Sequence, residues 1–198
     1  FHFEIYFCTV RIIFLFLFSM SVSVASAQLN ADKYISLARA DLEEQNHSLA
    51  IQRLNFALKT SPYNVEAFFL RAMAKHQLSD YSGAVIDYSH CIRLAPTSAA
   101  AYQNRGLSRA KMGDNKNAVE DFDRAIKYDP SNYFIYINKA YSQLQISDYT
   151  GAVKSCKRAI SMNEYMESGY LFRGIANFEQ KNIDIAIIDY SKTIEINP

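Results

Sequence analysis

The feature that most constrains the fold of this chain is a sequence pattern that returns every 34 residues. The points of this interval carry proline at Pro62, Pro96, Pro130 and Pro198, and Glu164 occupies the one point that lacks it. The pattern divides the chain into five units, over about residues 31–64, 65–98, 99–132, 133–166 and 167–198. A repeat of this length indicates a stack of similar small units, each of which depends on its neighbours to bury its apolar faces.

Side-chain size, and not only polarity, is held constant at matching positions of the units. One column is alanine in every unit: Ala50, Ala84, Ala118, Ala152 and Ala186. Another column is aromatic: Tyr34, Phe68, Tyr102, Tyr136 and Tyr170. A small residue follows each aromatic by four positions: Ala38, Ala72, Gly106, Ala140 and Gly174. Constant size predicts close packing at these positions, because added atoms in a packed contact force neighbours apart.

The spacing within one unit predicts two helices. Tyr102 and Gly106 lie one helical turn apart, and Ala118, Phe122 and Ala125 follow the spacing of an apolar stripe on a second helix. Proline near the end of four of the units stops the second helix, because it has no amide hydrogen to donate. At the start of the following unit, three polar residues are expected to cap the first helix. These residues are Asn64, Ser98 and Asn132.

These columns resemble the tetratricopeptide repeat, and the resemblance covers about residues 31–198. It implies an all-α fold, an α-solenoid in which antiparallel helix-turn-helix units form a superhelix. The sequence departs from the family pattern at Asp41, Cys156 and Glu164. Since the last two belong to the fourth unit, we expect a looser junction between the fourth and fifth units.

Residues 1–27 stand outside the repeat and have the pattern of a secretory signal peptide. Arg11 precedes the apolar run Ile12–Phe18, and small residues lead to Ala25 and Ala27. Cleavage is expected after Ala27, which would leave residues 28–198 as the repeat domain. The alternative is an uncleaved membrane anchor. Either way, the pattern predicts export to the periplasm, the envelope or the outside of a bacterial cell.

Charge and cysteine content exclude several classes of function. The chain has 21 basic and 20 acidic side chains, a net charge of +1, so no long-range field attracts nucleic acid. Cys91 and Cys156 fall in interior columns two units apart, too far for a disulfide, and are expected to be buried fillers. No metal-ligand spacing, phosphate-binding loop or catalytic constellation occurs. We therefore expect no cofactor, no metal, no small-molecule substrate and no enzymatic activity.

An arginine and an aspartate sixteen residues apart occur together in three units. The pairs are Arg71 with Asp87, Arg105 with Asp121, and Arg173 with Asp189. The other two units lack both, with Leu37 and Arg53 in one and Lys139 and Ser155 in the other. Their joint presence and absence predict a structural ion pair between the two helices of one unit. Coincidence among surface charges is the alternative, and exposed pairs contribute only about 0 to 1 kcal/mol.

The resemblance also implies a concave groove, lined by the first helix of each unit, that receives a peptide or a helix of a partner protein. Carried over by column, the lining consists of Phe69, Met73, Gln103, Asn104, Leu107, Phe134, Ile137, Asn138, Tyr141, Phe172 and Ile175. Asn104 and Asn138 are expected to hydrogen-bond a peptide backbone. The alternative is that several of the apolar members only fill contacts between neighbouring first helices.

Two functions of different class follow. The first is a non-enzymatic protein-interaction module outside the cytoplasm, with a protein or peptide partner and membrane contact only through an uncleaved N-terminal segment. The alternative is a structural scaffold or a sensor segment of a larger envelope protein whose C-terminal part is missing here. A clamp for a carboxylate terminus, known in some members of the family, is excluded because Phe69, Phe134 and Asn138 occupy positions where it needs cations.

Overall fold

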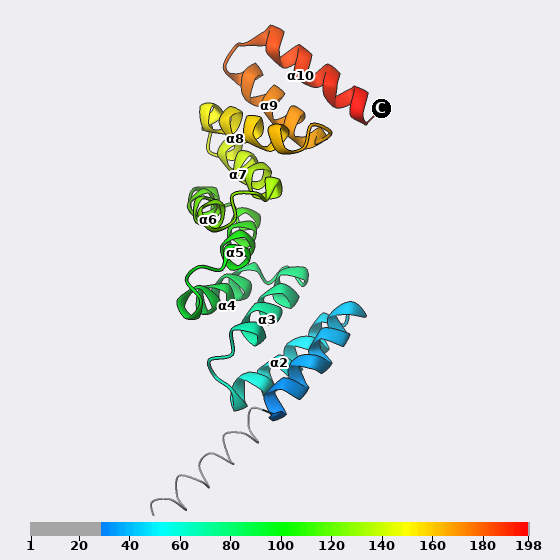
Figure 1. Cartoon of the computed structure of the whole chain (residues 1–198), viewed down its shortest axis with the longest axis vertical. Helices are drawn as coiled ribbons and strands as arrows, with labels where there is room; N and C mark the ends of the chain where they lie inside the picture. The colour runs from blue at the N-terminus through cyan, green and yellow to red at the C-terminus, as the bar shows by residue number, and fades with distance from the viewer. Residues whose placement is uncertain (1–28, 198) are drawn as a thin grey trace, which may run out of the picture.

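The computed structural model describes residues 29–197, which form α-helices joined by short turns, without a β-strand in that range. The helices follow one another in antiparallel pairs that stack in chain order into an elongated superhelix (Figure 1). The predicted signal peptide over residues 1–27 lies outside the described residues, as does Pro198. Between residues 29 and 197, no helix is both long enough and apolar enough to cross a membrane.

The helices repeat with the period of the sequence. A helix over residues 29–43 precedes α2, and both kinds of helix then start at intervals of 34 residues. The first helices of later units are α3 (Val65–Gln77), α5 (Ala99–Lys111), α7 (Tyr133–Gln145) and α9 (Glu167–Glu179). The second helices are α2 (His47–Thr60), α4 (Tyr81–Leu94), α6 (Asn115–Tyr128), α8 (Tyr149–Met162) and α10 (Ile183–Ile196). The predicted all-α solenoid of helix-turn-helix repeats is confirmed.

Side-chain caps start the first helices, as the sequence predicted. The Asn64 side chain accepts a hydrogen bond from the Ala67 amide at 2.9 Å, and Ser98 accepts one from the Ala101 amide at 3.3 Å. Asn132 caps α7 in the same way. Each cap satisfies an amide that would otherwise lack a partner inside the helix. The residue that precedes the helix therefore helps to set where the second, third and fourth units begin.

The alanine column lies in the interior of the stack. Ala50, Ala84, Ala118 and Ala152 are fully buried, and Ala186 is 1% exposed. The close approach at Gly106 involves Phe122: a Cβ added to Gly106 would lie 2.9 Å from the Phe122 ring. Phe122 lies one turn further along α6 than Ala118. Small residues thus allow the two helices of a unit to approach and leave room for one large side chain between them.

Replacing Ala118 by leucine is expected to lower the free energy of unfolding by about 1 to 3 kcal/mol, because the extra carbons have no space in a packed interior. The thermal unfolding midpoint measures the effect. The same change at the exposed Ala100 on α5 is the matched control and is expected to leave the midpoint nearly unchanged. An Ala118→Leu chain that melts like the wild type would contradict the stacking described above.

The three predicted ion pairs form, and they are more buried than the surface pairs considered in the sequence analysis. The guanidinium-to-carboxylate distances are 2.6 Å for Arg71 and Asp87, 2.7 Å for Arg105 and Asp121, and 2.6 Å for Arg173 and Asp189. All three aspartates are buried. The estimate of 0 to 1 kcal/mol for an exposed pair therefore does not apply, since removing one partner of a buried pair leaves an uncompensated charge.

Residues twelve positions before each aspartate complete these networks. Lys75 contacts Asp87 at 2.8 Å, Arg109 contacts Asp121 at 2.8 Å, and Asn177 donates weakly to Asp189 at 3.4 Å. In the first unit the acidic and basic positions are exchanged: Asp41 stands where the later units have Lys75 or Arg109, and Arg53 stands in the column of the aspartates. Arg53 lies 3.0 Å from the buried Asp41. The two groups form an ion pair by distance, but the Oδ2 atom of Asp41 accepts no hydrogen bond of good geometry. Four of the five units thus contain a buried carboxylate compensated across the two helices.

The start of the fifth unit lacks the side-chain cap found in earlier units. Met166 occupies the capping position of α9 and accepts no hydrogen bond through its side chain. We expect amides in the first turn of α9 to exchange about fivefold faster than those in the first turn of α5, since a cap is worth about 1 kcal/mol. Native-state hydrogen exchange measures this difference, and equal protection at the two sites would count against a looser junction.

The two described cysteines are free and buried, as expected for interior fillers. The Cys91 thiol lies 3.4 Å from the carbonyl oxygen of Val65, to which it can donate. Burial raises the pKa of each of the two thiols to about 12. Both therefore remain protonated at neutral pH and contribute to packing.

Candidate partner-binding groove

The first helices form one layer of the stack and the second helices form the other. Neighbouring helices lie closer together in the first layer than in the second, and this makes one face concave. First helices approach the next first helices directly, in the pairs α3 with α5, α5 with α7 and α7 with α9. Within the described part of the chain, no second helix makes the corresponding approach to the next second helix. The layer of first helices is therefore the shorter, inner side of the superhelix, and its solvent-facing residues form the groove.

The structure places most of the predicted lining on the first helices with at least part of the side chain accessible. Met73, Phe134 and Tyr141 are exposed large side chains. Five others are half-buried: Gln103, Asn104, Asn138, Phe172 and Ile175. These residues occupy successive turns of α3, α5, α7 and α9, so they offer a mixed apolar and amide surface along the stack.

Three apolar members of the predicted set serve the interior. Ile137 is 7% exposed, so its prediction as a surface residue is wrong. Its Cδ1 atom lies 3.6 Å from the point where a side chain of Gly169 would begin, and the Cγ1 atom of Ile160 lies closer to that point, at 2.8 Å. Phe69 packs edge-on against the buried Tyr88 at 5.6 Å, and Leu107 packs against the buried cluster around Phe122. For these residues the alternative of interior filling describes their contacts.

A small pocket lies between α5 and α7 on this inner layer. It has a volume of about 180 Å³, and Leu107, Asn138 and Tyr141 of the predicted set line it. Ala110, Lys111 and Phe122 complete the wall. Sequence reasoning missed Lys111, although it follows Leu107 by one helical turn and therefore lies on the same face of α5. The pocket combines an apolar floor with an amide and a cation at its edge.

Aromatic side chains extend the surface from this pocket toward the C-terminal end. The rings of Tyr141 and Phe172 lie 5.9 Å apart, across the contact between α7 and α9. At the beginning of α7, the Phe134 ring lies 4.3 Å from that of Tyr133. Paired, partly exposed aromatic rings provide large contact area with little conformational freedom to lose on binding.

The two asparagines differ in what they can offer a ligand. The Asn104 amide donates to the Ala100 carbonyl of its own helix at 3.0 Å, so part of its hydrogen-bonding capacity is used. The Asn138 side chain forms no hydrogen bond with another residue of the described range. An asparagine amide can donate and accept at once, which is what a peptide backbone requires. Asn138 is therefore the better placed of the two to bind a backbone.

The histidine near the groove is part of the packing. The His76 ring lies edge-on to Tyr81 at 5.1 Å, and its Nδ1 atom lies 2.9 Å from the Ser108 hydroxyl. Burial, and then the charge of Lys111, lower the pKa of His76 below its usual value. It is consequently neutral at pH 7. No carboxylate partner orients it, and no group of metal-binding side chains occurs among residues 29–197.

Comparison with known proteins shows which family and which solved structures have this architecture. Family profiles described as tetratricopeptide repeat match residues 35–99 and 99–132. No curated protein sequence matches significantly. Among solved structures, a crystal structure of MamA superposes with a TM-score of 0.81 and 19% identity, covering 84% of this chain and 91% of that one. MamA residues 41–end from Desulfovibrio magneticus RS-1 give 0.81 and 16%, covering 84% and 94%.

A third similar structure is that of YrrB, described as a tetratricopeptide-repeat protein with an unusual peptide-binding site. It superposes with a TM-score of 0.79 and 14% identity, and the match covers 90% of this chain and 92% of that one. At these identities the likeness concerns the fold. The profiles and the structures agree on the same repeated helical hairpin.

Proposed function

Because this chain belongs to the tetratricopeptide-repeat family, we propose that its concave face of first helices binds a segment of a partner protein. The observation that carries the proposal is the pocket between α5 and α7, with Tyr141 and Asn138 at its edge. Its volume of about 180 Å³ suits one apolar side chain of a peptide and not a whole small molecule, which usually occupies about 300 Å³ or more.

Binding would combine an apolar anchor with backbone recognition. A side chain entering the pocket contacts Leu107 and Tyr141, while the Asn138 amide pairs with the peptide backbone beside it. Lys111 at the edge favours a carboxylate near the anchor, because the two charges attract at short range. Phe134 and Phe172 extend the contact along the groove. This division into a buried aromatic or aliphatic anchor and a polar rim is typical of protein interfaces.

The activity we infer is interaction without catalysis, and the place we infer is outside the cytoplasm. The first inference is supported by the family and by the absence of an oriented acid–base pair around His76 within the described residues. The second is supported by the pattern of Arg11, Ile12–Phe18 and Ala27. Intact-mass analysis of the chain after expression in a bacterium tests export: a mature protein that begins at Gln28 is expected, and an uncut cytoplasmic chain would contradict it.

A structural scaffold is the second candidate, and the last helix favours it. Ile187, Ile188 and Ile194 of α10 are more than half exposed, and the columns of Ile187 and Ile194 are half-covered in earlier units. An apolar face of this size is suited to packing against another part of an assembly. In this role the array would hold other domains apart, and the groove would be unoccupied.

Peptide selection separates the two candidates. Peptides displayed on phage are selected on the immobilised chain, and the dissociation constant of a selected peptide is measured by calorimetry. Tyr141→Ala and Asn138→Ala are each expected to weaken binding about tenfold or more, which corresponds to a loss of about 1.4 kcal/mol. Ile86→Ala, an exposed apolar change on the second helix α4, is the matched control. Unchanged affinity in the groove variants would leave the scaffold as the better account.

A further inference from the structure

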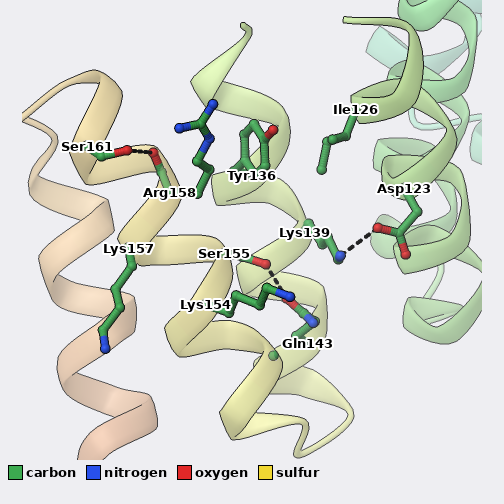
Figure 2. Close-up of a pocket in the computed structure, with 11 residues that line it drawn as sticks. Asp123, Ile126, Tyr136, Lys139, Gln143, Lys154, Ser155, Lys157, Arg158 and Ser161 are labelled. Carbon is green, nitrogen blue, oxygen red and sulfur yellow. Dashed lines mark hydrogen bonds and ion pairs between the residues drawn. The ribbon is translucent and has the colours of Figure 1, made fainter. Parts of the chain in front are cut away.

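The fourth unit has a hollow on the side of the second helices, away from the groove. It lies between α6 and α8 over α7, and its volume is about 490 Å³ (Figure 2). Tyr136, Lys139 and Gln143 of α7 line it, whereas Asn138 and Tyr141 of the same helix line the groove pocket. The two sites therefore lie on different faces of α7 and can be tested independently.

This hollow is where the internal ion pair of the other units is missing. Lys139 replaces the arginine and turns to Asp123 of α6, with its ammonium 2.6 Å from the carboxylate. Ser155 replaces the aspartate, and its hydroxyl donates to the Gln143 side chain at 2.7 Å. Figure 2 shows both bonds. Ser155 and Gln143 are each at most 5% exposed, so neutral polar groups form the floor in place of a buried carboxylate.

The wall of the hollow carries an excess of positive charge. Lys154, Lys157 and Arg158 of α8 line it in addition to Lys139, and Asp123 is the single carboxylate. Lys139 already neutralises Asp123. None of the three α8 cations forms an ion pair with another residue between positions 29 and 197. The whole chain has a net charge of +1, so this local excess is a property of the site and not of the overall composition.

The fifth unit provides an internal comparison. A hollow of about 440 Å³ occupies the corresponding position there, lined by Tyr170, Arg173 and Lys192. Its wall also contains Asp189 and Glu195, which balance the two cations. A hollow at this position therefore does not by itself distinguish the fourth unit. Unbalanced positive charge distinguishes the hollow of the fourth unit.

We propose that the hollow of the fourth unit binds an acidic peptide segment of a partner protein in an extended conformation. The part of α8 that lines it runs from Gly151 to Ser161, about 15 Å at 1.5 Å per residue, which is the length of four to five extended residues. Lys154 and Arg158 are separated by about 6 Å along the axis of α8. Alternate residues of an extended chain are about 6.6 Å apart. Acidic side chains at alternate positions therefore match the two cations.

The test measures binding of a fluorescein-labelled peptide with glutamate at three alternate positions to the full chain by fluorescence anisotropy. Saturable binding that weakens with salt is expected, because exposed charges are screened beyond about 10 Å at 0.1 M salt. The same peptide with glutamine in place of glutamate is expected not to bind. Lys154→Glu with Arg158→Glu is expected to weaken binding about tenfold or more. The matched control, Lys33→Glu with Lys116→Glu, changes the net charge equally at exposed positions outside the hollow.

A second variant rebuilds the ion pair of the other units. Lys139→Arg with Ser155→Asp supplies the hollow with its own carboxylate, so peptide binding is expected to fall about tenfold or more while the thermal midpoint does not drop. Tyr141→Ala, which changes only the groove, is expected to leave this binding unchanged. Equal loss in the control pair, binding that survives both hollow variants, or competition by inorganic phosphate at equal concentration would overturn the assignment to an acidic peptide.

Discussion

Replacing Arg105 by leucine is expected to lower the free energy of unfolding by about 3 to 5 kcal/mol, toward the lower end because Arg109 remains. Arg105 binds both oxygens of Asp121 through two nitrogens, at 3.0 and 2.7 Å, and donates to Ser89 of the preceding unit at 3.0 Å. Its loss leaves the carboxylate of Asp121 buried with one cation in place of two. Urea denaturation at neutral pH measures the change.

The chain contains a matched control for this substitution. Lys139 occupies the same column in the fourth unit, but its partner Asp123 is more than half exposed. Lys139→Leu is therefore expected to change the free energy of unfolding by less than about 1 kcal/mol. Similar losses in the two variants would show that burial of the carboxylate is not what makes the arginine important. A double change of Arg105 and Asp121 to leucine leaves no buried carboxylate, and Arg109, which loses its partner, is 23% exposed, so the double change should recover part of the loss.

Replacing Phe122 by alanine is expected to lower the free energy of unfolding by about 3 to 5 kcal/mol, because the ring is fully buried between α5 and α6 and its removal leaves a cavity. The ring also limits what Gly106 can become. In the wild type, Gly106→Ala would bring a methyl group to 2.9 Å from the ring. Alanine otherwise favours a helix over glycine by about 1 kcal/mol.

A double-mutant cycle separates these two effects. In the Phe122→Ala chain, Gly106→Ala should be more favourable than in the wild type, since the ring contact at 2.9 Å is gone, only the Asp121 Cβ contact at 3.2 Å remains, and alanine is the better helix former. In the wild type the same change should destabilise or be neutral. Thermal or urea denaturation of the four chains provides the measurement. An identical effect of Gly106→Ala in both backgrounds would contradict size matching between the column of small residues and the side chain that packs against it.

The sequence predicted the fold well because each contact of the stack is repeated within it. Alanine occurs at the position of Ala118 in all five units, and this repetition indicates that the position is buried. A single alanine would not indicate this. The caps Asn64 and Ser98 and the pairing of Arg105 with Asp121 were predictable for the same reason. These features depend on residues close along the chain or at a fixed interval, so no long-range topology had to be guessed.

The features that could not be predicted from the sequence depend on how far each side chain is buried and where it points. The spacing paired Arg71 with Asp87 but did not show that Asp87 is 1% exposed, nor that Lys75 joins it. Ile137 shares a helix face with groove residues, and the spacing did not show that it is only 7% exposed. The hollow of the fourth unit could be suspected from Lys139 with Ser155, but its charge arises from where the α8 side chains point.

We infer that the inner layer of first helices is the surface that receives a partner. Site-specific photo-crosslinking in the cell that makes the protein tests it most directly, with p-benzoylphenylalanine placed at Tyr141 on α7 or at Ile86 on α4, both exposed apolar positions. A discrete adduct with a second protein is expected from position 141 and not from position 86. An adduct from position 86 alone, or none from position 141, would contradict the claim.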